Sequence, residues 1–126
     1  MKMFDPHVIG SIDLITGQAL TVSGGATPSK TSNVLQISKL SKLHVYVGNT
    51  GPSTNVTVDI YGKTKETSTI KSHLATFTLG AGTAQTPYSA GRYIEKDAIP
   101  SFIYAVATNS DAENTANISV TLDRWR

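Results

Sequence analysis

The stretch "VGNTGPSTNVTVDIYG", residues 47–62, decides the fold that this sequence encodes. Valines alternate with polar residues on both sides of a group of Asn, Gly, Pro, Ser and Thr, and a period of two is typical of a half-buried strand. Gly51 tolerates the backbone angles of tight turns, and Pro52 presets its own φ. The segment therefore predicts a β-hairpin that turns about Gly51–Pro52.

The predicted hairpin has one apolar and one polar face. Its register forms an apolar row from three cross-strand pairs: Val47 with Val56, Val45 with Val58, and Leu43 with Ile60. The opposite face pairs Tyr46 with Thr57 and His44 with Asp59. A slip of one residue would expose the whole apolar row, so the inward and outward assignments are well specified.

Further short strands, separated by turn-rich loops, fill the rest of the chain. The alternation predicts strands at 8–15, 18–23, 33–39, 42–48, 55–62, 70–79, 101–108 and 116–123, with a short extended piece near 92–95. This spacing is typical of antiparallel sandwiches and barrels. We predict an all-β, antiparallel β-sandwich of about seven to nine strands in a single domain, residues 1–126. Jelly-roll and immunoglobulin-like topologies both remain open.

The composition excludes several classes of protein. The 126 residues include no cysteine, which excludes disulfide frameworks and thiolate metal sites. The net charge is +2 and the basic residues are spread along the chain, so neither a nucleic-acid arm nor a membrane patch is predicted. No apolar stretch reaches 18 residues and no secretory leader is visible. We expect a small, complete product made in the cytoplasm without a signal peptide.

Catalytic and metal-binding signatures are missing from the sequence. The histidines lack metal spacing, no G-x-S-x-G is present, and His44 with Asp59 lacks a neighbouring nucleophile. Asn109, Asp111 and Glu113 have the rhythm of a calcium loop, without its central glycine or final bidentate acid. We therefore predict no enzymatic activity, no cofactor and no bound metal.

A second stretch, "VATNSDAENTANISVTL" at residues 106–122, resembles the first. Asn49 matches Asn109 and Asn55 matches Asn117, although the two loops differ by two residues. Two turns in one sandwich meet the same conformational demands, and we prefer this explanation to a duplication because the rest of the chain shows no repeat.

Two groups of residues are candidates for binding. Tyr46, Tyr61 and Trp125 could form a stacking platform for a glycan, and aromatic residues equally anchor protein interfaces. Strand 101–108, "SFIYAVAT", is apolar on both faces, although a one-core sandwich needs only one apolar face. The second face, with Ile103, Ala105 and Ala107, is predicted to contact another subunit in a homo-oligomer, either a dimer or a trimer.

The segments "VGNTGPSTNVTVDIYG" and "FIYAVATN…NISVTL" resemble those of small β-sandwich proteins of bacteria and their phages. The resemblance covers roughly residues 42–126. It implies a virion accessory, such as a head decoration, head fibre or tail-associated component, which docks on other virion proteins. Similar hairpins occur in immunoglobulin-like bacterial surface domains. A carbohydrate-binding module or adhesion domain is therefore the alternative to a structural protein.

Overall fold

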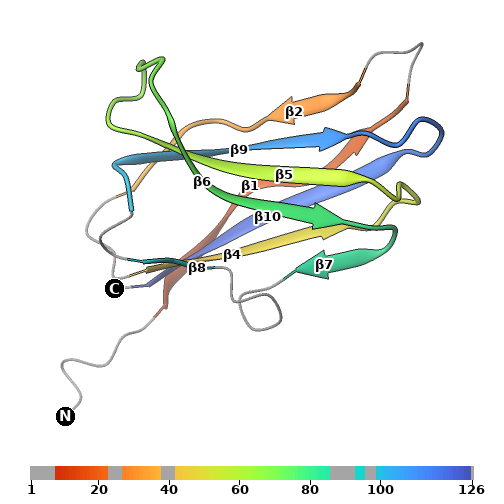
Figure 1. Ribbon diagram of the computed structural model, residues 1–126. Helices are drawn as coiled ribbons and strands as arrows, with labels where there is room; N and C mark the ends of the chain where they lie inside the picture. Colours follow the sequence, from red (N-terminus) through yellow and green to blue (C-terminus); the bar gives the residue numbers. More distant parts are fainter. Residues whose placement is uncertain (1–7, 23–26, 38–41, 86–92, 96–98, 126) are drawn as a thin grey trace.

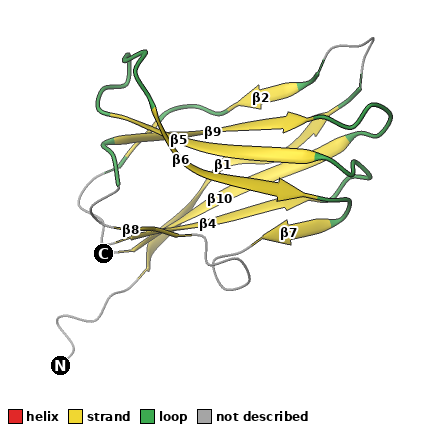
Figure 2. Cartoon of the chain, viewed as in Figure 1, coloured by secondary structure: helices red, strands yellow, loops and turns green. Residues whose placement is uncertain are grey.

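Two antiparallel sheets pack face to face as a β-sandwich, which confirms the predicted fold class (Figures 1 and 2). The computed structural model describes residues 8–22, 27–37, 42–85, 93–95 and 99–125, and these ranges contain no helix. The strands are β1 Val8–Leu20, β2 Ser29–Thr31, β3 Leu35–Gln36, β4 Lys42–Asn49, β5 Val56–Lys63, β6 Ser72–Leu79, β7 Thr83–Gln85, β8 Tyr93–Glu95, β9 Phe102–Asn109 and β10 Ala116–Trp125. The described residues form ten strands, of which β2, β3, β7 and β8 are fragments of two or three residues, and this agrees with the predicted number of about seven to nine.

The chain passes from one sheet to the other at most connections. The first sheet has the order β1-β10-β4-β7, with β8 also paired to β4. The second has the order β2-β9-β5-β6, with β3 also paired to β9. The fragments β2 and β3 lie along one neighbour, β9, and β7 and β8 lie along another, β4. Among the described full-length strands that follow one another directly in the chain, β5 and β6 share a sheet, whereas β4 and β5, and likewise β9 and β10, lie in different sheets.

The predicted hairpin of residues 42–62 is wrong in its pairing. Strand β4 pairs with β10, so that Val47 lies opposite Val120, and β5 pairs with β9 and β6, so that Val56 lies opposite Asn109 and Leu79. The loop between β4 and β5 carries the chain across the sandwich. Because both sheets turn their apolar faces toward the same core, alternation along a strand does not reveal which sheet the strand joins.

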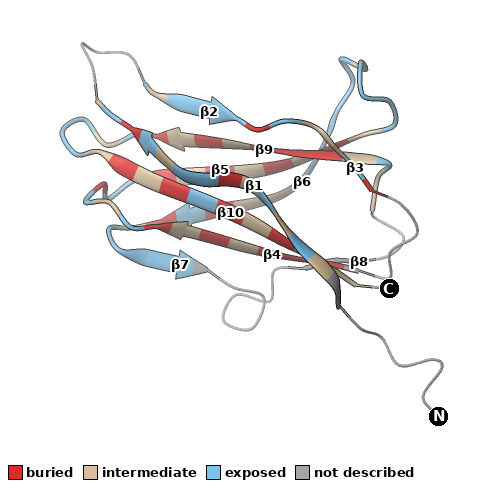
Figure 3. Ribbon diagram, turned by 180° about the vertical axis from the view of Figure 1, so that it is seen from behind, coloured by how far each residue is buried: buried red, intermediate tan, exposed pale blue. Residues whose placement is uncertain are grey.

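The inward and outward faces of these strands are as predicted. Buried and more exposed residues alternate along β5 and along most of β10 (Figure 3). Strand β4 follows the same pattern except at His44, which is 6% exposed although its parity is outward. The predicted apolar row is in the core, with exposed fractions of 0–3% for Leu43, Val45, Val47, Val56, Val58 and Ile60. Phe77 on β6 and Leu122 on β10 are fully buried beside them. Burial of each such side chain contributes about 1.5–3 kcal/mol.

Strand β1 replaces two predicted strands and their turn. The predicted strand 8–15 and the first residues of the predicted strand 18–23 form one strand along β10, with register shifts on both sides of Ile15. Residue 23 lies outside the described residues. Gly17 has φ of 51°, a left-handed angle that glycine adopts without strain. The Thr16–Gly17 pair therefore makes an irregularity within the strand. Within the described part of the predicted strand 33–39, β3 forms the strand, and residues 38–39 lie outside the described residues. Strand β8 matches the extended piece expected near 92–95.

Two crossing loops of six residues join the sheets at one end of the sandwich. We call residues 50–55, between β4 and β5, arch 1, and residues 110–115, between β9 and β10, arch 2. A buried asparagine, 1% exposed in each case, precedes each arch. The Asn49 side-chain oxygen accepts the backbone N–H groups of Gly51 and Asn117, and its nitrogen donates to the carbonyl oxygens of Ser53 and Gly80.

Asn109 holds arch 2 in the same way. Its side-chain oxygen accepts the Asp111 N–H and the Ser53 hydroxyl, and its nitrogen donates to the carbonyl oxygens of Leu20 and Asn114. The side chain of each asparagine thus accepts a hydrogen bond from the backbone N–H of the residue two positions later and donates one to a carbonyl oxygen within its own arch. It also donates a hydrogen bond to a carbonyl oxygen of a strand end or loop elsewhere in the chain. The similarity between the two sequence stretches therefore reflects a shared hydrogen-bonding arrangement.

The two arches interlock through their backbones. The Thr50 N–H donates to the Asn117 carbonyl oxygen, and the Ser110 N–H donates to the Asn55 carbonyl oxygen. Gly51 lies so close to arch 2 that an added Cβ would be 2.7 Å from the Thr115 oxygen and 2.9 Å from the Asn117 nitrogen. Since these are backbone atoms that cannot rotate away, Gly51 is required for close approach of the two arches.

Candidate functional site

A cluster of aromatic and basic residues lies on the outer face of the β2-β9-β5-β6 sheet. Tyr61 stacks on Tyr104, with ring centroids 5.4 Å apart and planes tilted by 22°, and its edge meets the His73 ring at 5.3 Å. The Lys71 ammonium is 4.3 Å from the Tyr61 centroid, and the Lys63 ammonium is 5.0 Å from the Tyr104 centroid. We call these five residues the tyrosine cluster.

Strand register assembles the tyrosine cluster from three strands. Tyr61 of β5 lies opposite Tyr104 of β9 and opposite His73 of β6. A register shift between Ile60 and Tyr61 aligns Tyr61 with His73. Because sequence analysis paired β5 with β4, it did not bring these residues together. One sequence feature could have indicated the cluster: Tyr61 and Tyr104 each occupy a position in their own strand whose side chain points away from the core.

Asp59 extends the cluster and corrects one predicted pair. Its partners are His73, with Nε2 2.8 Å from Oδ1, and Thr76, whose hydroxyl donates to the same oxygen at 2.7 Å. The predicted partner, His44, lies in the other sheet. The Thr76 hydroxyl is also 2.7 Å from His73 Nε2. A catalytic triad uses different ring nitrogens for nucleophile and carboxylate, so this shared-nitrogen arrangement is that of a surface polar cluster.

The predicted glycan platform is divided between the two outer faces of the sandwich. Tyr46 of β4 and Trp125 of β10 belong to the β1-β10-β4-β7 sheet, where the Trp125 ring lies 4.9 Å from the ring of His44. Tyr61 belongs to the other sheet, where it contacts the rings of both Tyr104 and His73. The three predicted residues therefore form no common surface.

The predicted interface residues Ile103, Ala105 and Ala107 lie in the core. All three have an exposed fraction of 0%, so their side chains cannot contact another subunit. They belong to the inward face of β9, and the second apolar face of this strand, which has Phe102, Tyr104 and Val106, turns outward. The excess apolar character of β9 was recognised correctly, but its two faces were interchanged.

The outer sheet face of β1 and β10 is acidic and polar. Thr121 donates to the Asp13 carboxylate at 2.7 Å, and Ser11 donates to the Asp123 carboxylate. The tyrosine cluster, in contrast, has two lysines beside one carboxylate, that of Asp59.

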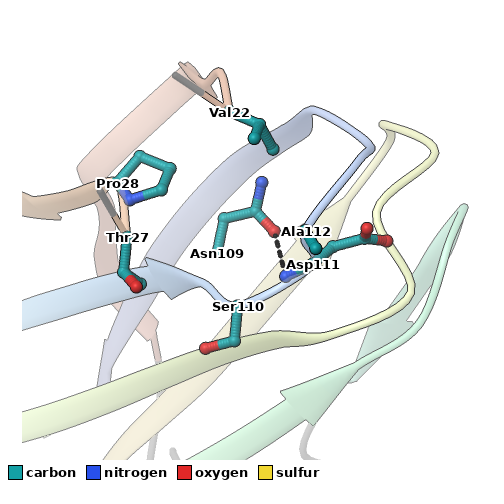
Figure 4. Close-up of a pocket in the computed structure, with 7 residues that line it drawn as sticks. All are labelled: Val22, Thr27, Pro28, Asn109, Ser110, Asp111 and Ala112. Carbon is teal, nitrogen blue, oxygen red and sulfur yellow. Dashed lines mark hydrogen bonds between the residues drawn. The ribbon is translucent and has the colours of Figure 1, made fainter. Parts of the chain in front are cut away.

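Asp111 fastens arch 2 to arch 1 beside a shallow pocket of about 210 Å³ (Figure 4). The pocket is lined by Val22, Thr27, Pro28, Asn109, Ser110, Asp111 and Ala112. The Asp111 carboxylate accepts five hydrogen bonds, from the backbone N–H groups and side chains of Thr54 and Asn114 and from the backbone N–H of Glu113. A carboxylate has about four lone-pair sites. Asp111 therefore acts as a loop clamp, and its oxygens are already engaged by donors.

The hydrogen bonds to Asp111 predict a contribution to stability that depends on pH. The backbone N–H groups of Thr54, Glu113 and Asn114 hold the pKa of Asp111 well below its usual range. A lowered carboxylate pKa stabilises the fold above the unfolded-state pKa of about 4, and this contribution is lost as the pH falls. We expect Asp111→Asn to lower Tm at pH 7 and the difference from wild type to shrink on acidification.

Thermal melts at several pH values would measure this effect, with Glu113→Gln as the matched change of carboxylate to amide in the same loop. A Tm difference between wild type and Asp111→Asn that stays constant from neutral to acidic pH would contradict the proposed role of the Asp111 carboxylate.

Two general features of the described residues bear on function. No group of three or more His, Cys, Asp or Glu within them could hold a metal ion. None of their segments forms a helix long and apolar enough to cross a membrane.

Comparisons with known proteins show the fold of the chain. No protein-family model and no curated protein matches the sequence. Among solved structures, PirA aligns over 90% of this chain and 92% of its own, with a TM-score of 0.53 and 10% identity. The infectious bursal disease virus VP2 subviral particle aligns over 97% of this chain, with a TM-score of 0.58 and 11% identity. The PBSX exported protein XepA aligns over 96%, with a TM-score of 0.55 and 8% identity.

The chain spans only part of two of these proteins, 37% of the XepA chain and 33% of the VP2 chain. At such low sequence identity, the similarity shows a shared sandwich fold and does not indicate a shared role.

Proposed function

We propose that this chain is a non-enzymatic structural protein of a phage or prophage virion, with a jelly-roll fold, which acts by self-assembly and by docking on a larger surface. A head decoration, head fibre or tail-associated component fits this description. The observation that carries the proposal is the strand order, together with the similarity of the fold to that of a viral subviral-particle protein.

The strand order supports a jelly roll over an immunoglobulin-like topology. If β2 and β3 count as one strand, and β7 and β8 as another, the sandwich has eight strands in two sheets of four. Jelly rolls are sandwiches of eight strands built from two Greek keys, and they occur in viral capsid and lectin domains. In immunoglobulin domains, several consecutive strands share a sheet. Here β5 and β6 are the consecutive full-length strands that do so.

Two features of the surface suit a docking role. The outer faces of the sandwich carry different sets of charged groups, with two lysines and Asp59 at the tyrosine cluster and Asp13 and Asp123 on the opposite face. Complementary charge guides association and selects partners. The interlocked arches hold the two sheets together at one end, so that both faces are presented on a rigid body.

Particle association is the direct test. Phage or prophage particles from the organism that encodes this chain would be purified on a density gradient and probed with an antibody against the chain. We expect the chain to band with intact particles and to resist removal by washing at moderate salt. Recovery of the chain exclusively from fractions without particles would contradict the virion role.

Carbohydrate binding is the alternative function, favoured by the tyrosine cluster. Lectin domains also use jelly rolls, and stacked tyrosines with nearby hydroxyl, imidazole and ammonium groups provide apolar and polar contacts for a sugar. If this alternative holds, Tyr61→Ala should abolish retention on a glycan array while leaving the circular-dichroism spectrum unchanged. Trp125→Ala, on the other outer face, is the matched control. An array without hits for folded wild-type protein would count heavily against glycan binding.

A further inference from the structure

We propose that two copies of this chain associate through reciprocal insertion of Ile70 into a recess between β1 and the segment before β3. This inference rests on the proposed function, because it names the contact through which the chain would self-assemble. It replaces the interface that sequence analysis placed on Ile103 and Ala105.

Ile70 is an unusual residue on this surface. Its exposed fraction is 81%, and among the described residues no other large hydrophobic side chain is exposed. It lies in the loop between β5 and β6, which projects beyond the sandwich (Figure 1). Lys65 and Lys71 lie on either side of it in this loop, and both are exposed. Isolated exposed apolar residues are common, so the argument depends on a complementary site.

The recess supplies that site on the same chain. It has a volume of about 250 Å³ and is lined by Ile12, Asp13, Leu14, Asn33, Val34 and Leu35. Four of these six residues are apolar. The volume is several times the roughly 30 Å³ of one water molecule in the liquid, and a branched side chain of four carbons fits within it. Asp13 provides a carboxylate at the recess, opposite in charge to the lysines that flank Ile70.

The positions of the two parts favour a reciprocal contact. Lys63, where β5 ends before the loop, and Gln36, next to the recess segment, both lie opposite Phe102 at the start of β9. The loop and the recess therefore lie toward the same end of the sandwich. In a two-fold dimer each copy presents the same surface, so that Ile70 of each copy reaches the recess of the other. Such a contact closes on itself and forms no open filament.

The test is sedimentation equilibrium of the full chain over a range of concentrations. Wild type should pass from the monomer mass of 13.4 kDa to twice that mass. Burial of one isoleucine is worth about one to two powers of ten in affinity. Since the dimer buries two, we expect Ile70→Ser to weaken dimerisation at least about 100-fold. Thr67→Ala, an exposed substitution in the same loop, should leave dimerisation unchanged.

A charge exchange then identifies the recess as the partner site. Lys71→Glu alone and Asp13→Lys alone should each weaken the dimer several-fold, and the double variant should recover most of the loss. A wild type that stays monomeric at the highest concentration, an Ile70→Ser variant that dimerises like wild type, or a double variant weaker than both single variants would each overturn the proposal. Because particle association is measured independently, a virion-bound chain with an unaffected Ile70→Ser variant would refute this contact alone.

Discussion

Val45→Asp is expected to unfold the domain. Val45 is 1% exposed and lies opposite Leu122, which is fully buried on β10. An aspartate there would place a carboxylate in the core without a partner, and unpaired buried charges are among the few causes of destabilisation above about 4 kcal/mol. Because domains are stable by about 5–15 kcal/mol in total, we expect little folded protein. Urea unfolding followed by circular dichroism would measure the loss.

Thr57→Asp is the matched control for this substitution. Thr57 lies on the outer face of β5, between Thr78 and Thr108. The same charge there remains in contact with water, and substitutions at such positions usually change stability by about 0.5 kcal/mol or less. Equal loss of stability in the two variants would show that the inward and outward faces of these strands are assigned incorrectly.

Asn49→Ala is expected to produce the second-largest loss, by separating the interlocked arches. The substitution removes a side-chain amide that donates two hydrogen bonds and accepts two, at a residue that is 1% exposed. Each buried backbone group left without a partner costs about 1–3 kcal/mol. We expect a loss of about 3 kcal/mol or more, which corresponds to a fall in Tm on the order of 10 °C for a domain of this size.

Two further variants make the experiment on the arches specific. Asn109→Ala should reduce Tm by a similar amount, because Asn109 makes the equivalent contacts in arch 2. Asn55→Ala changes the same residue type at an exposed position and should have little effect. If Asn49→Ala melts at the same temperature as Asn55→Ala, the side-chain bonds within the arches do not hold the sheets together.

Much of the architecture could be predicted because strands reveal their faces in the sequence. The alternation of valine and isoleucine with polar residues placed Val45, Val58 and their neighbours in the core. The turn residues of arch 1 marked where the chain reverses. The repeated Asn49 and Asn109 indicated two related turns, and the structure shows that both asparagines bond in equivalent ways.

Pairing was not predictable from these residues. A strand with alternating polarity can lie in either sheet of a sandwich, since both sheets present an apolar face to one core. The sequence reading therefore joined β4 to β5 as a hairpin, and it paired His44 with Asp59. The two faces of β9 were interchanged for a different reason: both parities of this strand are apolar, so alternation does not show which one points inward.

The sequence by itself determined the fold class, the inward apolar row and the positions of the loops that became the two arches, because these depend on local alternation and backbone preference. Only the tertiary structure decided which strands are neighbours, that Tyr61, Tyr104 and His73 form one cluster, and that a recess complementary to Ile70 exists. These features join residues from distant parts of the chain, and their distances are set by sheet order and register, which no single segment encodes.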